Sequence, residues 1–345
     1  MSVKRPAASK LELLRGRPVL VAGLGSIGRR HVRNLQALGV TDFVFYRTRQ
    51  GTLADDELSA HPTFTDLDEA LARKPALAIV ANPTASHLSV AQSAAEAGCH
   101  LLIEKPLSHS RAGVDELAAV IARQSLTTLI GCQFRFHPLL AELRRGLAAG
   151  RLGRVIGARA EWGEYLPDWH PWEDHRRSYS ARSDLGGGVV LTLIHPLDYM
   201  YWLFGPVDRV HAETRAIPSL ETAAGEDWAE ITLRFSSGVV AAVHLDYWQK
   251  PAVHTLEVTG EAGSVRWDYH GGTLTWRQAS GETTESLPEG FERNTMFVDE
   301  MRHFLECAAE GRPTDIPLAD GIAVLDVALG AKQSAETGEH VALTS

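Results

Sequence analysis

The sequence predicts two domains: an α/β domain with a parallel sheet, followed by an α+β domain with a large, mostly antiparallel open sheet. The chain has 345 residues, about twice the length of an average domain. Up to about residue 131, short apolar runs alternate with helical stretches, which is typical of βαβ units. After Gly153 the segments become longer and alternate between apolar and polar residues, which indicates antiparallel strands.

The composition is that of a globular protein, with 44% hydrophobic and 22% charged residues. There are 34 basic and 43 acidic residues, so no cationic excess favours nucleic acid or a membrane surface as a partner. Only three cysteines are present, without a Cys-x-x-Cys pair, which argues against a disulfide framework and a thiolate zinc site. No stretch of about 18 apolar residues occurs. We expect a cytoplasmic protein whose residues 1–16 form a flexible leader.

In the first domain the apolar runs predict five strands, and the stretches between them predict helices. The expected strands are Val19–Ala22, Phe43–Tyr46, Leu77–Ala81, Leu101–Ile103 and Thr128–Gly131. The expected helices are His31–Leu38, Leu67–Arg73, Ser86–Ala97 and Ser110–Arg123.

In the second domain alternation predicts seven strands, and two helical patterns close the chain. Ser236-Ser237-Gly238 is a tight hairpin signal, because glycine supplies the positive φ of such turns. The expected strands are Val155–Tyr165, Arg209–Ala216, Ala229–Phe235, Val239–Tyr247, Thr255–Thr259, Ser264–Asp268 and Thr273–Arg277, and the expected helices are Thr295–Ala309 and Ala319–Glu336.

A Gly-x-Gly-x-x-Gly motif stands directly after the first strand and before a helix. Gly23 permits the tight turn, Gly25 lets a pyrophosphate approach the backbone, and Gly28 allows close packing of helix and strand. Together with Ser26 and Ile27, which stand between the second and third glycines, the motif predicts a dinucleotide site. The alternative is a glycine turn without a ligand.

The end of the second strand indicates which dinucleotide binds. An NAD site usually has Asp or Glu there, about 20 residues after the motif, whereas this chain has Arg47, Thr48 and Arg49. Two guanidinium groups beside a hydroxyl suit a 2′-phosphate, so the sequence favours NADP over NAD. The alternative is that both arginines are solvated loop charges and that NAD binds without a carboxylate partner.

Three further elements follow in a specific order: Asn82-Pro83-Thr84-Ala85-Ser86-His87 directly after the expected strand Leu77–Ala81, Glu104-Lys105-Pro106 at the end of a parallel strand, and the segment 131–138. In order and spacing they resemble the Gfo/Idh/MocA family of NAD(P)-dependent oxidoreductases, over residues of about 17–335. The resemblance implies a Rossmann domain at 17–138 and a substrate-binding and oligomerisation domain at 139–345. The helix at about 319–336 would pack back on the first domain.

The resemblance also implies roles for residues of the first domain. Lys105 would be the active-site lysine at the reacting oxygen. The protein would form a homodimer or homotetramer through the open sheet. Besides the glycine motif and the residues at the end of the second strand, the implied cofactor contacts are Asn82, Pro83, Thr84, His87, Glu104 and Lys105.

A glycine triplet, Gly186 to Gly188, begins a segment that looks like the family's second signature. There His195 would accept the proton of a sugar or polyol hydroxyl, and an imidazole suits this role because its unperturbed pKa lies near neutrality. The family usually has an aspartate one turn earlier, where this chain has Thr192, which cannot stabilise an imidazolium by charge. Either His195 works with Lys105 alone, or a carboxylate comes from elsewhere; Asp198 is a candidate that could equally be structural.

The segment 165–182 is rich in aromatic, histidine and arginine residues. In a long loop such residues suit a substrate pocket, because aromatic faces pack on sugar C–H groups and cations bind hydroxyl or anionic groups. The alternative is that they anchor the loop on the core. A metal site here matches no zinc spacing, so we expect none. The expected substrate-binding residues are Lys105, Arg135, Trp169, His170, Arg176, Tyr179, Thr192, His195 and Asp198.

The resulting expectation is an NAD(P)-dependent dehydrogenase that oxidises or reduces a sugar, amino-sugar, nucleotide-sugar or cyclic polyol. Two alternatives remain open at this point. One is a glycosidase that retains NAD, and the other is a non-catalytic sensor of sugars or cofactor.

Overall fold

The computed structural model describes residues 16–48, 60–171 and 173–343. By its internal contacts the chain divides into two units. The first unit ends at Gln133 and includes Glu292–Ile322, and the second comprises Phe134–Phe291 and the chain from Ala323 onward. Apart from its last residue, the expected leader at 1–16 lies outside the described residues.

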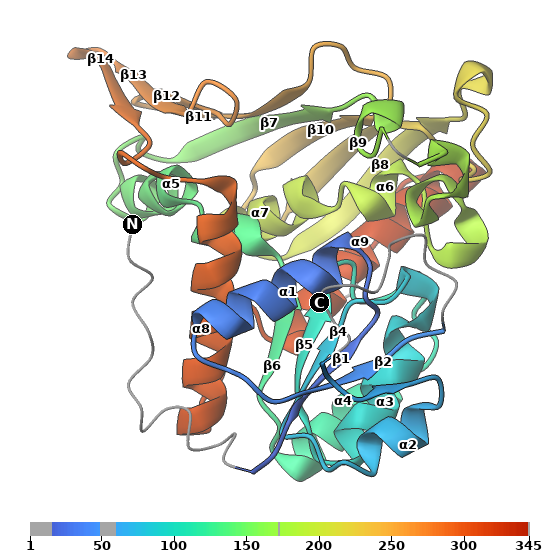
Figure 1. Ribbon diagram of the computed structural model, residues 1–345. Coiled ribbons are helices and arrows are strands. Elements are labelled where there is room, and N and C mark those ends of the chain that lie inside the picture. The colour runs from blue at the N-terminus through green and yellow to red at the C-terminus, as the bar shows by residue number, and fades with distance from the viewer. Residues whose placement is uncertain (1–15, 49–59, 172, 344–345) are drawn as a thin grey trace. The chain divides into compact units, whose positions relative to one another are not determined.

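The first unit is built on a parallel six-stranded sheet of order β3-β2-β1-β4-β5-β6 (Figure 1). This is the strand order of dinucleotide-binding folds, in which ligands bind beyond the carboxyl ends of the strands. Helices α1 and α8 pack on each other, as do α3 and α4. The elements are β1 Val19–Ala22, α1 Ser26–Ala37, β2 Phe43–Tyr46, β3 Thr63–Phe64, α2 Leu67–Leu71, β4 Leu77–Val80, α3 His87–Glu96, β5 His100–Glu104, α4 Val114–Gln124, β6 Thr128–Gly131 and α8 Arg293–Glu310.

The second unit is built on a nine-stranded sheet of order β14-β13-β12-β11-β7-β10-β9-β8-β15, antiparallel except between β7 and β10. Its helical elements include α5 Pro138–Ala148, α6 Val189–Thr192, α7 His195–Phe204 and most of α9 Leu318–Thr337. The strands are β7 Val155–Gly163, β8 Val207–Arg215, β9 Trp228–Phe235, β10 Val240–Asp246, β11 Val253–Gly260, β12 Gly263–Asp268, β13 Thr273–Gln278, β14 Gly281–Ser286 and β15 Val341–Ala342.

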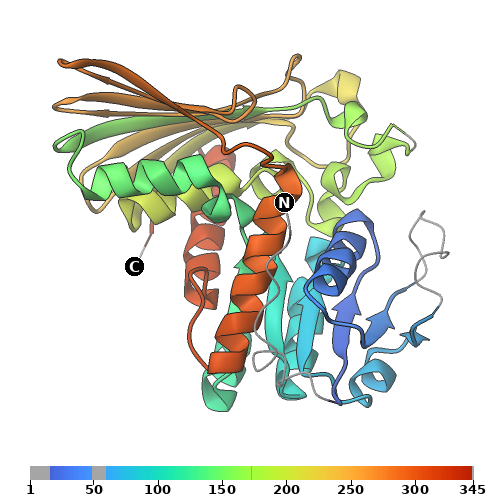
Figure 2. The ribbon, with the colours of Figure 1, turned by 60° about the vertical axis from the view of Figure 1, so that its left-hand side comes forward.

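One face of the nine-stranded sheet carries helices. Figures 1 and 2 both show α5 and α7 along this face, and contacts join α5 to β12 and α7 to β7. In both views, no helix among the described residues of this unit lies on the other face. The alternation of buried and exposed residues along β9 and β10 follows from this arrangement.

The fold class predicted from the sequence is confirmed, while some element limits were wrong. Helix α1 begins at Ser26 rather than at His31, because Gly28 lies within the first turn and does not interrupt the helix. The hairpin glycine, Gly238, has the expected positive φ of +87°. Strands β3, β14 and β15 and helix α5 were not predicted.

Candidate functional site

The glycine motif of the first unit has a distinct geometric reason at each position. Gly23, at φ +90°, follows β1, and a Cβ there would lie 2.5 Å from the backbone nitrogen of Asn82. A Cβ at Gly28 would collide with the Gly23 carbonyl oxygen. At Gly25, which is exposed, a Cβ would meet nothing within 4 Å. The first and third glycines therefore close the turn, and the second leaves the backbone open to a ligand.

The residues around this turn fit a dinucleotide. Gly25 is the N-cap of α1 and no side chain caps the helix, so the N–H groups of its first turn can bind a phosphate. The side-chain oxygen of Asn82 is buried without a hydrogen-bond partner, which is the environment of an atom that a ligand would satisfy. Gly23 N–H donates to the carbonyl of Tyr46, the last residue of β2.

Of the residues expected to choose between NADP and NAD, Arg47 is half-buried and Thr48 is exposed, directly after β2. Arg49 lies outside the described residues. The expected contacts Ser26 and Ile27 lie in the first turn of α1. Pro83 is exposed and Thr84 is buried, at the start of a short 3-10 helix, Thr84–Ser86.

Lys105 lies half-buried at the carboxyl end of β5, where an open parallel sheet binds ligands. The Lys105–Pro106 peptide bond is cis. The preceding carboxylate, that of Glu104, is buried and lies 2.7 Å from His31 Nε2. Burial raises the pKa of Glu104, but the His31 hydrogen bond and the nearby positive charges outweigh it, so this pKa is below its usual range. The strand end therefore presents the lysine beside a fixed carboxylate.

His87, the first residue of α3, contacts the backbone that follows β5. Both ring nitrogens lie 2.8 Å from carbonyl oxygens, Nδ1 from that of Pro106 and Nε2 from that of Asn82. Burial lowers the pKa of His87. These contacts are internal to the protein and link the Asn82 turn to the Glu-Lys-Pro element.

In the second unit, the glycine triplet allows close backbone packing before α7. A Cβ at Gly187 would collide with the Tyr179 carbonyl oxygen, and one at Gly188, at φ +105°, with the Glu226 carboxylate. Glu226 is buried and lies 2.7 Å from Lys332 Nζ. The triplet thus allows the segment that leads to His195 to pack closely against the Tyr179 backbone and the Glu226 side chain.

His195 is the first residue of α7 and is 2% exposed. Its imidazole stacks on the indole of Trp162, with ring centroids 5.5 Å apart and an interplanar angle of 25°. Phe134 contacts it edge-on at 4.9 Å. Thr192 is also buried, as is Tyr247, whose pKa is raised by burial. The ring of His195 is therefore oriented by aromatic packing.

Asp198, the candidate for the carboxylate that the Thr192 position lacks, is engaged by a neighbouring cation. Its side chain pairs with Arg135, whose Nε lies 3.1 Å and whose Nη2 lies 2.6 Å from Asp198 Oδ1. Arg135 also lies over the ring of Trp202, at 6.0 Å. Both residues were expected to bind substrate, and these contacts favour a structural role instead.

Several residues around His195 were missed by sequence reasoning. Trp162 stacks on His254 at 4.2 Å and 4° as well as on His195. The Tyr199 hydroxyl lies 3.5 Å from His254 Nε2. The alternation of β7 and β11 predicts that Trp162 and His254 face the core, but alternation does not indicate which buried residue meets the histidine.

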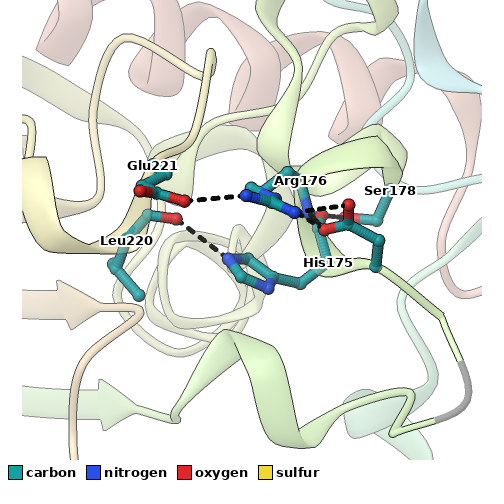
Figure 3. A network of polar contacts seen from close by, with 6 residues as sticks. His175, Arg176, Ser178, Leu220 and Glu221 are labelled. Carbon is teal, nitrogen blue, oxygen red and sulfur yellow. Dashed lines mark hydrogen bonds and ion pairs between the residues drawn. The ribbon is translucent and has the colours of Figure 1, made fainter.

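The loop at 165–182 folds into short 3-10 turns. Figure 3 shows the Arg176 side chain directed at Glu221 and the His175 ring directed at the Leu220 carbonyl, at 2.8 and 2.9 Å. Arg176 also binds Asp174 and lowers the pKa of that carboxylate to about 2. The guanidinium expected to bind substrate therefore joins two loops.

The other expected residues of this loop lie partly buried. Trp169 packs edge-on against Tyr247, with ring centroids 5.7 Å apart, and its indole N–H has no hydrogen-bond partner. His170 and Tyr179 are half-buried. Among the described residues, no group of three or more His, Cys, Asp and Glu is arranged to hold a metal ion. In that part of the chain, no helix is long and apolar enough to cross a membrane.

Comparison with protein-family models matches the two parts of the chain separately. Residues 17–132 match the oxidoreductase family with an NAD-binding Rossmann fold, and residues 140–266 match the GFO/IDH/MocA C-terminal domain. The chain belongs to the Gfo/Idh/MocA family of oxidoreductases. The expected enzyme class, an NAD(P)-dependent oxidoreductase acting on CH–OH groups, is confirmed at the level of this family.

Relatives within the Gfo/Idh/MocA family include myo-inositol dehydrogenase Hyg17 of Streptomyces leeuwenhoekii, 29% identical over 93% of this chain and 98% of the relative. Another is 1,5-anhydro-D-fructose reductase of Ensifer adhaerens, 30% identical over 73% of this chain and 77% of the relative. A levoglucosan dehydrogenase solved with NADH and levoglucosan has the same fold, with a TM-score of 0.85 and 19% identity over 95% of this chain and all of the other.

Proposed function

We propose that the protein is an NADP-dependent dehydrogenase of a sugar or cyclic polyol, with Lys105 and His195 acting at the reacting oxygen. The observation that carries the proposal is the dinucleotide turn at Gly23–Gly28 together with a lysine at the carboxyl end of β5 in the same unit. The names of the relatives, which act on inositol, an anhydro-sugar and levoglucosan, support a polyhydroxylated substrate.

In the proposed reaction, Lys105 and His195 have different roles at the reacting oxygen. When bound, the nicotinamide supplies hydride acceptance or donation at its C4 atom. The Lys105 ammonium donates a hydrogen bond to the reacting oxygen and stabilises negative charge that develops there. His195 takes the hydroxyl proton during oxidation and returns it during reduction. In the oxidation direction the substrate would therefore lose one proton to His195 and one hydride to the bound cofactor.

The residues that contact the strand end at Lys105 and the ring of His195 support these two roles. Glu104 and His87 hold the strand end that carries Lys105, while Trp162 and Phe134 hold the ring of His195. From the loop, Trp169, His170 and Tyr179 are proposed to contact the substrate. Thr192, which ends α6 three residues before His195 begins α7, is proposed to contact it as well.

The preference for NADP rests on Arg47 and on the lack of a carboxylate at the end of β2. A planar guanidinium can bind a 2′-phosphate with two hydrogen bonds, whereas a carboxylate there would repel it. As part of the same proposal, the protein acts in the cytoplasm as a homodimer or homotetramer. All three cysteines are buried thiols, which suits a reducing compartment.

The test is to titrate the purified protein with NADP+ and NAD+ by tryptophan quenching and to screen sugars, inositols and amino-sugars for reduced-cofactor absorbance. Lys105→Ala should abolish turnover while cofactor binding is retained, and His195→Asn should do the same. Release of a leaving group without net reduction would indicate a glycosidase instead. Tight cofactor binding with no turnover on any substrate would indicate a sensor.

A further inference from the structure

A buried hydrogen bond joins the helix that begins at the dinucleotide turn to the Glu-Lys-Pro element. His31 lies in the second turn of α1, its side chain is fully buried, and its Nε2 lies 2.7 Å from Glu104 Oε1. The two residues are 73 positions apart in the chain. Because an ionised carboxylate only accepts hydrogen bonds, the geometry assigns a proton to Nε2, which donates to Glu104.

The carboxylate of Glu104 has little freedom to move. It faces Gly131 of β6, the residue opposite it in the sheet, where a Cβ would lie 3.1 Å from the carboxyl carbon. Its second oxygen accepts the backbone N–H of Lys105 at 3.3 Å. One carboxylate therefore receives hydrogen bonds from His31 on one side and from the lysine's own backbone on the other.

We propose that His31 is a positioning residue for Lys105. It acts through Glu104, and it links Lys105 to the glycine turn because both His31 and that turn belong to α1. The inference rests on the proposed role of Lys105. Loss of the imidazole would leave a buried carboxylate short of a donor, and such a group reorients or draws in water at a cost. The Lys105 backbone would then lose its fixed acceptor.

Asn34 offers a matched control in the same helix. It lies one turn further along α1, it is 3% exposed, and its Oδ1 accepts a hydrogen bond from Asn294 Nδ2 of α8 at 2.9 Å. A change at Asn34 disturbs the packing of α1 on α8 and leaves the bond to Glu104 in place, whereas a change at His31, whose ring also lies edge-on to Phe297 of α8, removes that bond. Comparison of the two separates the positioning of Lys105 from general loss of helix packing.

The experiment compares His31→Leu, His31→Gln and Asn34→Leu with the wild-type full-length protein. The first readout is amide hydrogen exchange of peptides covering residues 104–108, which needs neither substrate nor cofactor. We expect exchange there to become about tenfold faster or more in His31→Leu, because a hydrogen bond to a charged group is lost. In His31→Gln, whose amide can donate to Glu104, protection should be largely kept. Asn34→Leu should leave this segment protected.

The second readout is kinetic and uses any sugar or polyol that the wild-type protein turns over. His31→Leu should lower kcat by about tenfold or more, with Kd for NADP+ changed less than about threefold, and His31→Gln should restore kcat. Unchanged exchange in His31→Leu, an equal effect of Asn34→Leu, or faster exchange with unchanged kcat would each overturn the proposal. Full activity of Lys105→Ala would instead overturn the proposed function, and the exchange result would still report on the bond between His31 and Glu104.

Discussion

The guanidinium of Arg135 and the carboxylate of Asp198 form a buried ion pair in the second unit, with each side chain only 2% exposed. The contact is bidentate, since Nε and Nη2 both reach the carboxylate. Asp198 lies three residues after His195, on the helix that His195 begins. The pair therefore ties α7 to the segment around Arg135 and neutralises the acidic side chain in the first turn of α7.

Breaking this pair should destabilise the second unit. Asp198→Asn leaves the Arg135 cation buried without its counter-charge, and we expect the free energy of unfolding to fall by about 3–5 kcal/mol in urea denaturation. Asp115→Asn, which breaks the exposed pair with Arg111, should cost less than about 1 kcal/mol. An Asp198→Asn variant of unchanged stability and raised substrate KM would instead show that Asp198 binds substrate.

Removal of the Trp162 indole should impair catalysis by freeing the His195 ring. Trp162→Leu removes the stacked surface, and we expect kcat to fall by roughly tenfold with little change in cofactor Kd, since misplacement of a catalytic group by about 1 Å is costly. Trp162→Phe keeps an aromatic face and should recover most of kcat. Trp267→Phe, at a buried indole that packs edge-on against His254, is the control. Equal losses in the two phenylalanine variants would argue against a specific role for the stack.

His137 should make the protein less stable in mild acid. Burial lowers the pKa of this histidine to about 4, and neither ring nitrogen has a hydrogen-bond partner. Below pH 6.5 the unfolded chain therefore binds a proton that the folded chain refuses until about pH 4. Between pH 6.5 and 5 this costs about 2 kcal/mol of unfolding free energy.

The variant His137→Phe should remove this part of the acid sensitivity, because the aromatic ring fills the site beside Trp267 and Phe291 without titrating. Urea denaturation at pH 7.5 and at pH 5 measures the difference. His109→Gln, at an exposed histidine, controls for the loss of one imidazole. If wild type and His137→Phe lose stability equally on acidification, the buried neutral state is wrongly assigned.

Arg47→Ala should change the choice of cofactor. Loss of a bidentate contact to a 2′-phosphate weakens NADP+ binding by about tenfold or more and leaves NAD+ binding nearly unchanged. Arg73→Ala is the control, because Arg73 lies with Pro18 and Asp42 at the amino ends of the strands, away from the carboxyl ends that bind ligands. Equal weakening of NADP+ and NAD+ in Arg47→Ala would contradict the assignment of the 2′-phosphate to this side chain.

Local patterns in the chain were sufficient for strands β1, β2, β4, β5 and β6 of the first unit and for the glycine turn. Periodicity and the need for glycine at a tight turn act over a few residues, so both can be found without tertiary structure. Strands β3 and β15, of two residues each, carry too little pattern to be found. Helix α5 was missed although Pro138 marks its first turn.

The sequence by itself determined the two-domain α/β and α+β plan, the family, and the side chains available for chemistry. Only the tertiary structure decided which of those side chains are committed to one another: Arg135 to Asp198, Arg176 to Asp174 and Glu221, and His31 to Glu104. The physical reason is that two of these arrangements join residues more than 60 positions apart. The role of a charged group depends on which partner the fold places beside it. A residue type and its local spacing do not contain that information.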